Sequence, residues 1–274
     1  MLTLINGQES ASVDVPDRGL QYGDGLFETI AVGDGRISLW DRHLERLADG
    51  CRRLAIVMPD RQLLRAEVQR VAGNAAHAVV KIIVTRGSGG RGYRPDGNAL
   101  TTRIVQGLSW PQHPPEAARD GVVVRWCTLQ LARQPRLAGL KHLNRLEQVL
   151  ARAEWRDEYA EGLMCDRTGL VIEGTMSNLF IVHQGVLTTP DLSESGVAGV
   201  VRAEVLARAP TLGIPVPAHA VTPRMVEAAE ELFLTNSLIG VWPIRQLETR
   251  NYVVGKITQA LQQALPEELS GGGA

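Results

Sequence analysis

Apolar residues follow a strand-like pattern in several parts of this chain. Residues 78–86 (AVVKIIVTR) and 121–129 are long runs rich in β-branched side chains, which favour strands. The Asn6-Gly7 pair after residues 2–5 is typical of a hairpin turn. Shorter runs of the same kind predict strands at residues 26–32, 101–108, 163–166, 170–173, 179–182 and 231–235.

Between these strands, apolar residues at steps of three and four predict amphipathic helices. The first is capped by Ser38 or Asp41 and ends near residue 56. Thr222 followed by Pro223 is an N-cap signal for another helix. Residues 17–25, which contain three glycines, read as a loop. The mixture predicts an α/β (α+β) protein, with further helices at residues 61–72, 202–212 and 253–265.

The segment 110–118 (WPQHPPEAA) differs from both patterns. Paired prolines break helix and sheet and favour an extended connection. With 274 residues, 44% of them hydrophobic, the chain is long enough for two domains. We therefore predict an N-terminal domain at 1–109, a linker at 110–118 and a C-terminal domain at 119–274.

The most informative stretch is residues 137–150 (LAGLKHLNRLEQVL). Leu143, Leu146, Leu150 and Ala153 recur at helical spacing, so Lys141 is expected in or just before the first turn of an amphipathic helix. A lysine held by a packed helix start is desolvated, which lowers its pKa and makes it a nucleophile or a base. The alternative is an ordinary surface lysine near a helix cap.

Charge and cysteine content narrow the class of protein. The chain has 29 basic and 30 acidic residues, a balance unlike that of a general binder of nucleic acid or acidic membranes. Three scattered cysteines suggest free thiols in a reducing compartment. The first residues lack the features of a signal peptide, so we expect a soluble cytoplasmic protein.

Other chemistries find little support. The histidines have no paired metal-ligand spacing, so no metal site is predicted, and neither a P-loop nor a GxSxG motif occurs. Residues 87–92 match GxGxxG, but Pro95 and Gly97 oppose the helix that a dinucleotide site requires. Three interpretations of this segment stay open: a nucleotide-binding turn, an active-site loop that presents Arg91, and a plain turn.

What remains is Lys141, the carboxylate of Glu173 at a strand end, and glycines before a helix at residues 196–202. A Schiff-base amine, an acid partner for a ring nitrogen and an anion cradle together suit pyridoxal 5′-phosphate. The chain resembles the fold-type IV pyridoxal-phosphate enzymes over nearly its whole length. The matching blocks are YGDGLFET at 22–29, HLERL at 43–47, residues 137–150, EGTMSNLF at 173–180 and GVAGVVR at 196–202.

This resemblance implies a two-domain fold, with an N-terminal α/β sandwich and a C-terminal α/β pseudo-barrel. It implies that Lys141 bonds to the cofactor aldehyde and that Glu173 pairs with the pyridine nitrogen. Asn178 would lie beside the ring. A tyrosine common shortly after the lysine in the aminotransferases is replaced here by Asn144 and Arg145. The implied phosphate ligands are Arg46, the helix start at Gly199, Val200 and Val201, and the turn at Asn236 and Ser237.

Within the group, residues 86–93 and 137–150 are similar to the 4-amino-4-deoxychorismate lyases. The resemblance implies a homodimer, and a lyase that releases 4-aminobenzoate and pyruvate, with Lys141 as the general base. An aminotransferase for D- or branched-chain amino acids is the alternative. Arg86 or Arg94 can take the place of Arg91, and Phe27 can be a core residue. The substrate-binding candidates are Tyr22, Phe27, Lys81 and Arg91, because a dicarboxylate favours basic partners.

Overall fold

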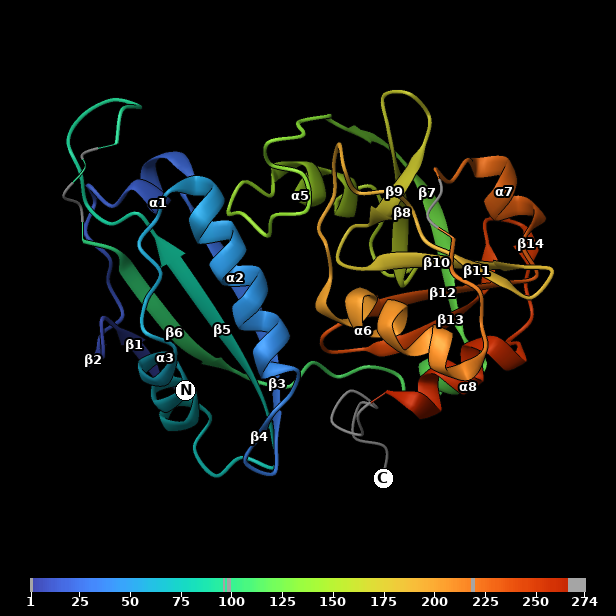
Figure 1. Ribbon diagram of the computed structural model, residues 1–274, viewed down its shortest axis with the longest axis horizontal. Helices are drawn as coiled ribbons and strands as arrows, with labels where there is room; N and C mark the ends of the chain where they lie inside the picture. Colours follow the sequence, from blue (N-terminus) through green and yellow to red (C-terminus); the bar gives the residue numbers. More distant parts are fainter. Residues whose placement is uncertain (1, 96, 98–99, 218–219, 266–274) are drawn as a thin grey trace. The chain divides into compact units, whose positions relative to one another are not determined.

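A computed structural model describes residues 2–95, 97, 100–217 and 220–265 (Figure 1). The chain divides into two compact units. The first comprises Met1–Pro111 with Leu140–Asn144, and the second comprises Gln112–Gly139 with Arg145–Ala274. The segment that carries Lys141 therefore packs with the first unit, although both of its neighbours along the chain belong to the second.

The first unit is built on a six-stranded antiparallel sheet in the order β2-β1-β6-β5-β3-β4. The predicted hairpin at Asn6-Gly7 is confirmed, since Ile5 pairs with Gln8. In β5 the side chains of Val80, Ile82 and Val84 are fully buried, as the β-branched run predicts. The strands are β1 (Thr3–Ile5), β2 (Gln8–Glu9), β3 (Gly25–Gly33), β4 (Arg36–Ile37), β5 (His77–Thr85) and β6 (Thr102–Leu108).

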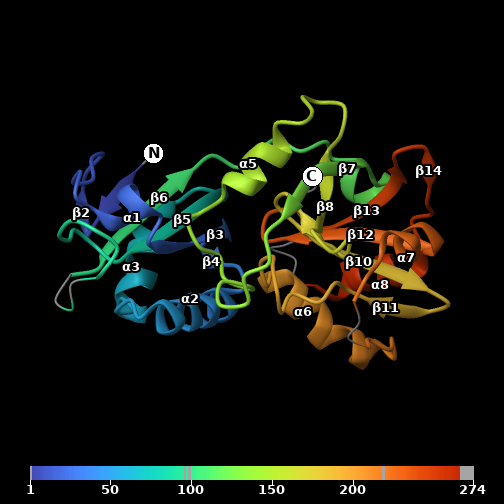
Figure 2. The same cartoon turned by 90° about the horizontal axis from the view of Figure 1, so that it is seen from above.

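Helices α2 (Trp40–Leu54) and α3 (Arg61–Ala72) cover one face of this sheet (Figure 2). Leu44, Leu47, Cys51 and Leu54 recur at helical spacing and predict the buried side of α2. This is confirmed for Leu44, Leu47 and Cys51, whereas Leu54 is only partly buried. The predicted caps are wrong, because α2 begins after Leu39, which has a φ of 45° and no capping side chain. The hydrophobic pattern locates the buried side of the helix but not its first residue.

Residues 17–25 contain a short helix, α1 (Arg18–Tyr22), and not only the loop that the glycines suggest. Asp17 caps it, with its Oδ1 accepting a hydrogen bond from Gly19 N at 2.8 Å. Gly23 ends the helix at a φ of 63°, where a Cβ would lie 2.5 Å from Asn144 Oδ1. Glycine at this position ends the helix and admits the Lys141-bearing segment beside it.

The second unit contains an eight-stranded sheet with the path β11-β10-β12-β13-β7-β8-β9, and β14 pairs with β13. Three residues connect β9 to β10, although four strands lie between them in the sheet. Three residues span about 14 Å at most, whereas five strand spacings in a flat sheet need about 24 Å. The sheet therefore curls into a half-barrel. Its strands are β7 (Val122–Leu131), β8 (Glu161–Asp166), β9 (Val171–Gly174), β10 (Asn178–His183), β11 (Val186–Thr188), β12 (Glu231–Asn236), β13 (Gly240–Leu247) and β14 (Arg250–Asn251).

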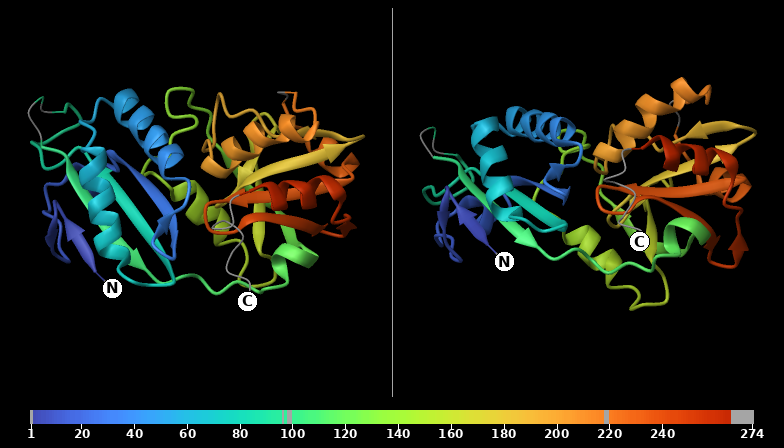
Figure 3. Two further views of the ribbon diagram at one scale, coloured as in Figure 1. Left: turned by 60° about the horizontal axis from the view of Figure 1, so that its bottom comes forward. Right: turned by 90° about the horizontal axis from the view of Figure 1, so that it is seen from below.

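The helices of this unit lie on two sides of the curled sheet (Figure 3). Helices α6 (Val200–Arg208) and α8 (Lys256–Ala264) pack on β12 and β13, while α5 (Leu146–Arg152) packs on β7 and β8. Phe180 and Phe233 stack in the core with ring centroids 4.8 Å apart. The remaining helices are α4 (Ala117–Asp120), α7 (Pro223–Ala228) and a 3₁₀ turn at Ala209–Leu212. In the described residues, no helix is long and apolar enough to cross a membrane.

The amphipathic helix predicted to start at or just after Lys141 is largely wrong. Residues 140–145 are not helical, and α5 is only seven residues long. Leu146 and Leu150, expected on its buried side, are 75% and 60% exposed. Lys141 thus does not belong to a helix turn. It lies in an extended segment instead.

Candidate functional site

The Lys141 segment extends the edge of β3 in the first unit. Phe27 N donates to Lys141 O at 2.9 Å, and Leu143 N donates to Gly25 O at 3.0 Å. A Cβ on Gly25 would lie 2.6 Å from Val84 O and 2.8 Å from Leu143 Cδ1. Only glycine allows the three segments to approach so closely. These two backbone hydrogen bonds to β3 therefore fix the position of Lys141.

Phe27 brings two of the predicted site lysines together. The Nζ atom of Lys141 lies 4.4 Å from the centroid of the Phe27 ring, and that of Lys81 lies 5.0 Å from the same centroid. The ring is partly exposed and is not a pure core residue. An aromatic face that attracts cations keeps both amines next to one surface. Lys141 and the substrate candidates Phe27 and Lys81 thus share one place in the first unit.

Arg46, predicted to hold the phosphate, is paired within its own unit. Its Nε donates to Glu28 Oε1 at 2.9 Å, and its Nη2 contacts Glu28 Oε2. His43 Nδ1 is 2.6 Å from Glu28 Oε2. Burial opposes ionisation of Glu28, but the charge of Arg46 and the hydrogen bonds from His43 and Arg46 lower its pKa to about 2. Burial also lowers the pKa of His43, so we treat it as a neutral donor.

The buried cluster of Glu28, His43 and Arg46 leads us to predict how the stability of the protein changes in acid. The pKa of Glu28 falls from 4.5 to about 2 on folding, so its carboxylate stabilises the protein fully above pH 4.5. The contribution is about 3 kcal/mol and is lost as the pH falls toward 2. In urea unfolding between pH 6 and 3, we expect Glu28→Gln to be less stable at pH 6 and to lose less stability on acidification. Glu45→Gln removes one negative charge in the same way, but at an exposed position, and should behave as the wild type. Parallel curves for the Glu28 variant and the wild type would contradict this.

The loop after β5 is braced by Arg18 and Tyr22. Arg18 donates to Gly92 O at 2.9 Å and to Tyr93 O at 3.0 Å, and the Tyr22 hydroxyl accepts from Gly92 N at 3.2 Å. No helix follows the GxGxxG segment within the described residues, so the context for a dinucleotide site is absent there. Tyr22 therefore supports the loop as well as being a substrate candidate.

The three arginines of this loop differ in their surroundings. Arg86 is held by both oxygens of Asp24, at 2.7 and 3.0 Å, and also donates to the carbonyls of Leu54 and Ala55. Arg91 and Arg94 are exposed. Arg86 is thus a structural residue, and Arg91 remains the substrate candidate, with Arg94 as the alternative.

In the second unit, Glu173 and Asn178 hold one loop. Glu173 Oε2 accepts from Val197 N at 2.8 Å, and Asn178 Oδ1 accepts from Gly199 N at 3.1 Å. The Asn178 amide also donates to Val197 O at 2.9 Å. Both side chains come from strand ends, Glu173 from β9 and Asn178 from the start of β10. The two polar residues that the resemblance assigns to the ring thus meet at residues 197–199.

The helix start beyond this loop has the properties of a phosphate cradle. Gly199 is the N-cap of α6, with no capping side chain and no acidic residue in the first turn. The amides of Val200 and Val201 are therefore well placed for an anion. A Cβ on Gly199 would lie 2.1 Å from Asn178 Oδ1, so only glycine fits. The residues present suit the phosphate group.

The Asn236-Ser237 turn offers further polar groups in the same unit. Asn236 Oδ1 accepts from Leu238 N and Ile239 N at 2.8 and 3.0 Å, which fixes the turn. The buried Thr235 Oγ1 has no hydrogen-bond partner among the described residues. An unsatisfied buried hydroxyl is costly, and an oxygen-rich ligand would satisfy it.

The loop at residues 196–199 also holds the chain just before the lysine. Gly139 N donates to Gly196 O at 2.9 Å, and Ala198 N donates to Gly139 O at 3.1 Å. Lys141 follows two residues later along the chain. The backbone that precedes the lysine is therefore paired with the loop that Glu173 and Asn178 organise.

Two neighbours of Glu173 were not predicted. Gln148 Nε2 lies 3.5 Å from Glu173 Oε1. Burial lowers the pKa of Arg145, and the carboxylates of Glu173 and Glu147 act in the opposite direction. The charge of Arg145 thus interacts with the carboxylate that the resemblance assigns to the ring nitrogen. The sequence singles out Arg145 only as a replacement for the tyrosine common in the aminotransferases, and Gln148 carries no signal beyond its nearness to Lys141.

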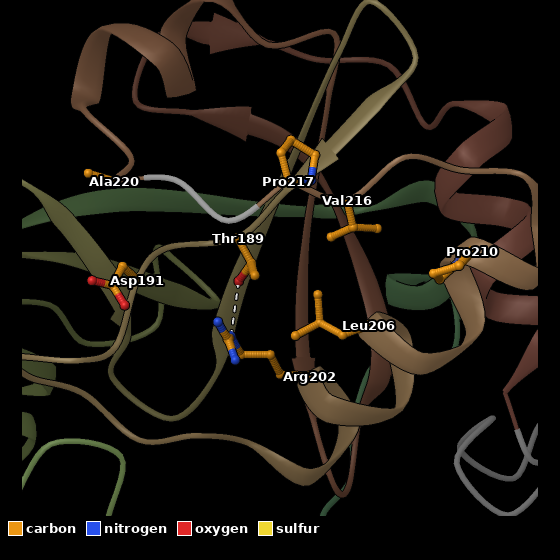
Figure 4. Close-up of a pocket in the computed structure, with 8 residues that line it drawn as sticks. All are labelled: Thr189, Asp191, Arg202, Leu206, Pro210, Val216, Pro217 and Ala220. Atoms are coloured by element: carbon orange, nitrogen blue, oxygen red, sulfur yellow. Dashed lines mark hydrogen bonds between the residues drawn. The ribbon is translucent and has the colours of Figure 1, made fainter.

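A pocket of about 620 Å³ lies beside α6, and none of the predicted site residues lines it (Figure 4). Arg202, on its wall, donates from Nε to Thr189 Oγ1 at 3.2 Å and from Nη2 to Pro190 O at 3.1 Å. Burial lowers the pKa of Arg202, and Asp191 opposes that shift. Arg202 thus ties the body of α6 to the end of β11 and supports the cradle at the helix start.

Comparisons with known proteins place this arrangement in a class. Residues 25–247 match the family of amino-transferase class IV, and the chain belongs to this family. Its cofactor is pyridoxal 5′-phosphate and its fold is fold-type IV, so the predicted family, fold and cofactor are confirmed.

Within the class, the chain is similar to particular enzymes. It is 36% identical to aminodeoxychorismate lyase of Vibrio harveyi, covering 94% of this chain and 97% of the relative. The crystal structure of 4-amino-4-deoxychorismate lyase from Pseudomonas aeruginosa matches with a TM-score of 0.94 and 48% identity, covering 98% of this chain and 100% of that one. A putative branched-chain-amino-acid aminotransferase of Methanocaldococcus jannaschii is 33% identical, covering 96% and 94%.

Proposed function

We propose that this protein is a pyridoxal-phosphate-dependent lyase that converts 4-amino-4-deoxychorismate to 4-aminobenzoate and pyruvate, a step toward folate. The observation that carries the proposal is the 48% identity over essentially the whole chain to a lyase of that name. The placement of Lys141 against Phe27, and of Glu173 and Asn178 on the start of α6, supports it.

When bound, the cofactor supplies an aldehyde that bonds to amines and a protonated ring that accepts electrons. In this proposal Lys141 would hold the cofactor until the substrate amine takes its place on the aldehyde carbon, and the freed Lys141 amine would then take the proton from C4 of the substrate. The C3–O bond breaks, the enolpyruvyl group leaves as pyruvate once a proton is supplied, and the ring becomes aromatic. No oxidant or water is consumed. Lys141 can return the proton that it removed.

The other residues bind and orient. Glu173 would hold the positive charge at the ring nitrogen, and Asn178 would lie beside the ring. Lys81 and Arg91 bind the substrate carboxylates, with Tyr22 and Phe27 shaping that side. Arg46 adds a cationic phosphate contact, which Glu28 orients through Nε and Nη2. The phosphate would be held at the helix start Gly199–Val201, by the amides of Val200 and Val201 because the Gly199 amide is bonded to Asn178, and by the turn at Asn236 and Ser237.

The second candidate function is an aminotransferase, which the 33% identity to the archaeal relative favours. Incubation of the holoenzyme with 4-amino-4-deoxychorismate should release pyruvate and 4-aminobenzoate in equal amounts. A parallel assay would follow amino-group exchange between D-alanine or L-leucine and 2-oxoglutarate. Exchange without pyruvate release from the chorismate derivative would assign the chain to the aminotransferases.

A homodimer that works in the cytoplasm is part of the same proposal. Leu146, Val149 and Leu150 on α5 are all at least 59% exposed, and such apolar clusters often mark subunit contacts. Cys51, Cys127 and Cys165 are free thiols, which suits a reducing compartment. Light scattering on the purified protein tests the dimer, and a monomer mass at micromolar concentration would contradict it.

A further inference from the structure

Glu161, at the start of β8, is a buried carboxylate that sequence analysis did not single out. It is 2% exposed and forms no ion pair among the described residues. Its Oε1 accepts from Gly162 N at 2.9 Å, from Thr175 N at 3.0 Å and from Thr175 Oγ1 at 2.5 Å. Its Oε2 accepts from Met176 N at 3.1 Å and from Ser177 Oγ at 2.7 Å. Five neutral donors therefore satisfy this one carboxylate.

Four of the five donors belong to the turn that joins β9 to β10. This turn closes the curled sheet, because it connects two strands that are far apart in the sheet order. Glu173 lies one residue before Gly174, which precedes the turn, and Asn178 is the first residue after it. The turn is also held by Gly174 N, which donates to Ser177 O at 2.8 Å, and by Asn236 Nδ2, which donates to Met176 O at 3.2 Å.

The turn packs directly on the carboxylate. A Cβ on Gly174 would lie 2.8 Å from Glu161 Oε2 and 2.4 Å from Ser177 Oγ. The carboxylate thus fills the inside of the turn, and its two oxygens accept hydrogen bonds on both sides. A neutral side chain of the same shape cannot do this, since an amide presents donors on one side.

We infer that Glu161 is a positioning residue for the cofactor. It fixes the turn that sets the spacing between Glu173, at the ring nitrogen, and Asn178, which holds the helix start for the phosphate. The inference rests on the proposed roles of those two residues. In this inference Glu161 makes no contact with the cofactor or the substrate. It acts through the turn and through Asn236, whose amide bonds Met176 O.

The test is Glu161→Gln in the full-length protein, reconstituted with pyridoxal 5′-phosphate. The amide NH₂ would face either Met176 N or Gly162 N, so one of these backbone donors loses its acceptor, whereas Thr175 N also donates to Gly162 O at 3.1 Å. We expect the dissociation constant for pyridoxal 5′-phosphate to rise roughly 10-fold or more. The pH dependence of the bound cofactor's visible absorbance should also shift, because Glu173 moves relative to the ring. Both are measured well below the unfolding temperature of each variant.

Glu231 offers a matched control in the same unit. It is 7% exposed and accepts from Ile257 N at 3.3 Å, from Thr258 N at 2.8 Å and from Thr258 Oγ1 at 2.7 Å. These donors lie at the start of α8 and not in the turn. Glu231→Gln should lower the unfolding temperature while leaving cofactor affinity and absorbance unchanged.

A second pair of variants guards against a misfolded Glu161→Gln. Thr175→Val removes one hydroxyl donor with little change of shape and should weaken cofactor binding. Thr175→Ser keeps the hydroxyl donor and should bind the cofactor as tightly as the wild type. Wild-type affinity in Glu161→Gln, or in Thr175→Val, would overturn the inference, as would equal weakening in Glu231→Gln. A wild-type protein that fails to bind pyridoxal 5′-phosphate would instead overturn the proposed function.

Discussion

Replacing Lys141 with alanine is expected to lower the rate of pyruvate release by on the order of 10⁴-fold, the upper end of what a general base contributes. The change removes both the amine that bonds to the cofactor and the base that takes the C4 proton. The visible absorbance band of the lysine-bound cofactor should also disappear. Pyruvate release under substrate saturation and the absorption spectrum of the reconstituted protein measure the two effects.

The fold should survive this substitution. Lys141 is held to β3 through its carbonyl oxygen, which alanine keeps, and its side chain rests on the partly exposed ring of Phe27. A far-ultraviolet spectrum and an unfolding midpoint close to those of the wild type are expected. Loss of activity can then be assigned to the amine and not to unfolding.

Lys81 is the matched control, because its amine lies 5.0 Å from the same ring centroid. Lys81→Ala should keep the absorbance band and raise the KM for substrate, since we assign Lys81 to a carboxylate of the substrate. Reduction with borohydride, digestion and sequencing of the labelled peptide then identify the bonded residue. A label on Lys81, or normal turnover in Lys141→Ala, would remove the mechanism.

The elements that sequence predicts well here are those with a local cause. The β-branched run of β5 and the Thr222-Pro223 start of α7 depend on neighbouring residues, and both are confirmed. The helix predicted after Lys141 failed for the opposite reason. Leu146 and Leu150 have helical spacing, but spacing alone does not distinguish a buried face from an exposed one. The pairing of residues 141–143 with β3 joins segments more than 110 residues apart, which local patterns cannot reveal.

The site shows the same division. Lys141 and Glu173 were proposed from residue types and from the resemblance, because both lie in long motifs. The buried carboxylates that position other site residues are not predicted. Glu28 sits in an apolar strand, and nothing in the sequence indicates that Arg46 and His43 pair with it. Glu161 precedes the apolar run of β8, and four of its five donors come from a turn that starts fourteen residues later. Acidic residues inside strand-like runs were the one available signal.

Arg46 shows how such a support changes an interpretation. The resemblance assigns its guanidinium to the phosphate, whereas the structure commits Nε and Nη2 to Glu28. A guanidinium fixed by a carboxylate loses less rotational freedom when it meets an anion. The buried carboxylate thus orients the proposed phosphate ligand and also, through its lowered pKa, stabilises the unit at neutral pH and less so as the pH falls toward 2.

The second large effect is expected for Glu173→Gln. The glutamine oxygen can still accept the hydrogen bond from Val197 N, so the loop and the cofactor affinity should change little. The negative charge that holds the proton on the ring nitrogen is lost. A hydrogen bond to a charged group contributes about 1.5–3 kcal/mol, so proton removal from C4 should slow roughly 10- to 100-fold. Single-turnover pyruvate release with saturating cofactor measures this.

Glu147 makes this prediction specific. Its carboxylate also faces Arg145, and its Oε1 accepts from Ala132 N at 2.7 Å, but no hydrogen bond joins it to the loop at residues 197–199 within the described chain. Glu147→Gln should therefore keep the wild-type rate. Equal slowing in both variants would mean that the rate depends on the total negative charge near Arg145, and that Glu173 has no specific effect on the ring nitrogen. Unchanged turnover in Glu173→Gln would show that the ring nitrogen needs no carboxylate here. A slowed Glu173 variant beside a normal Glu147 variant would assign the stabilisation of the protonated ring nitrogen to Glu173 on β9.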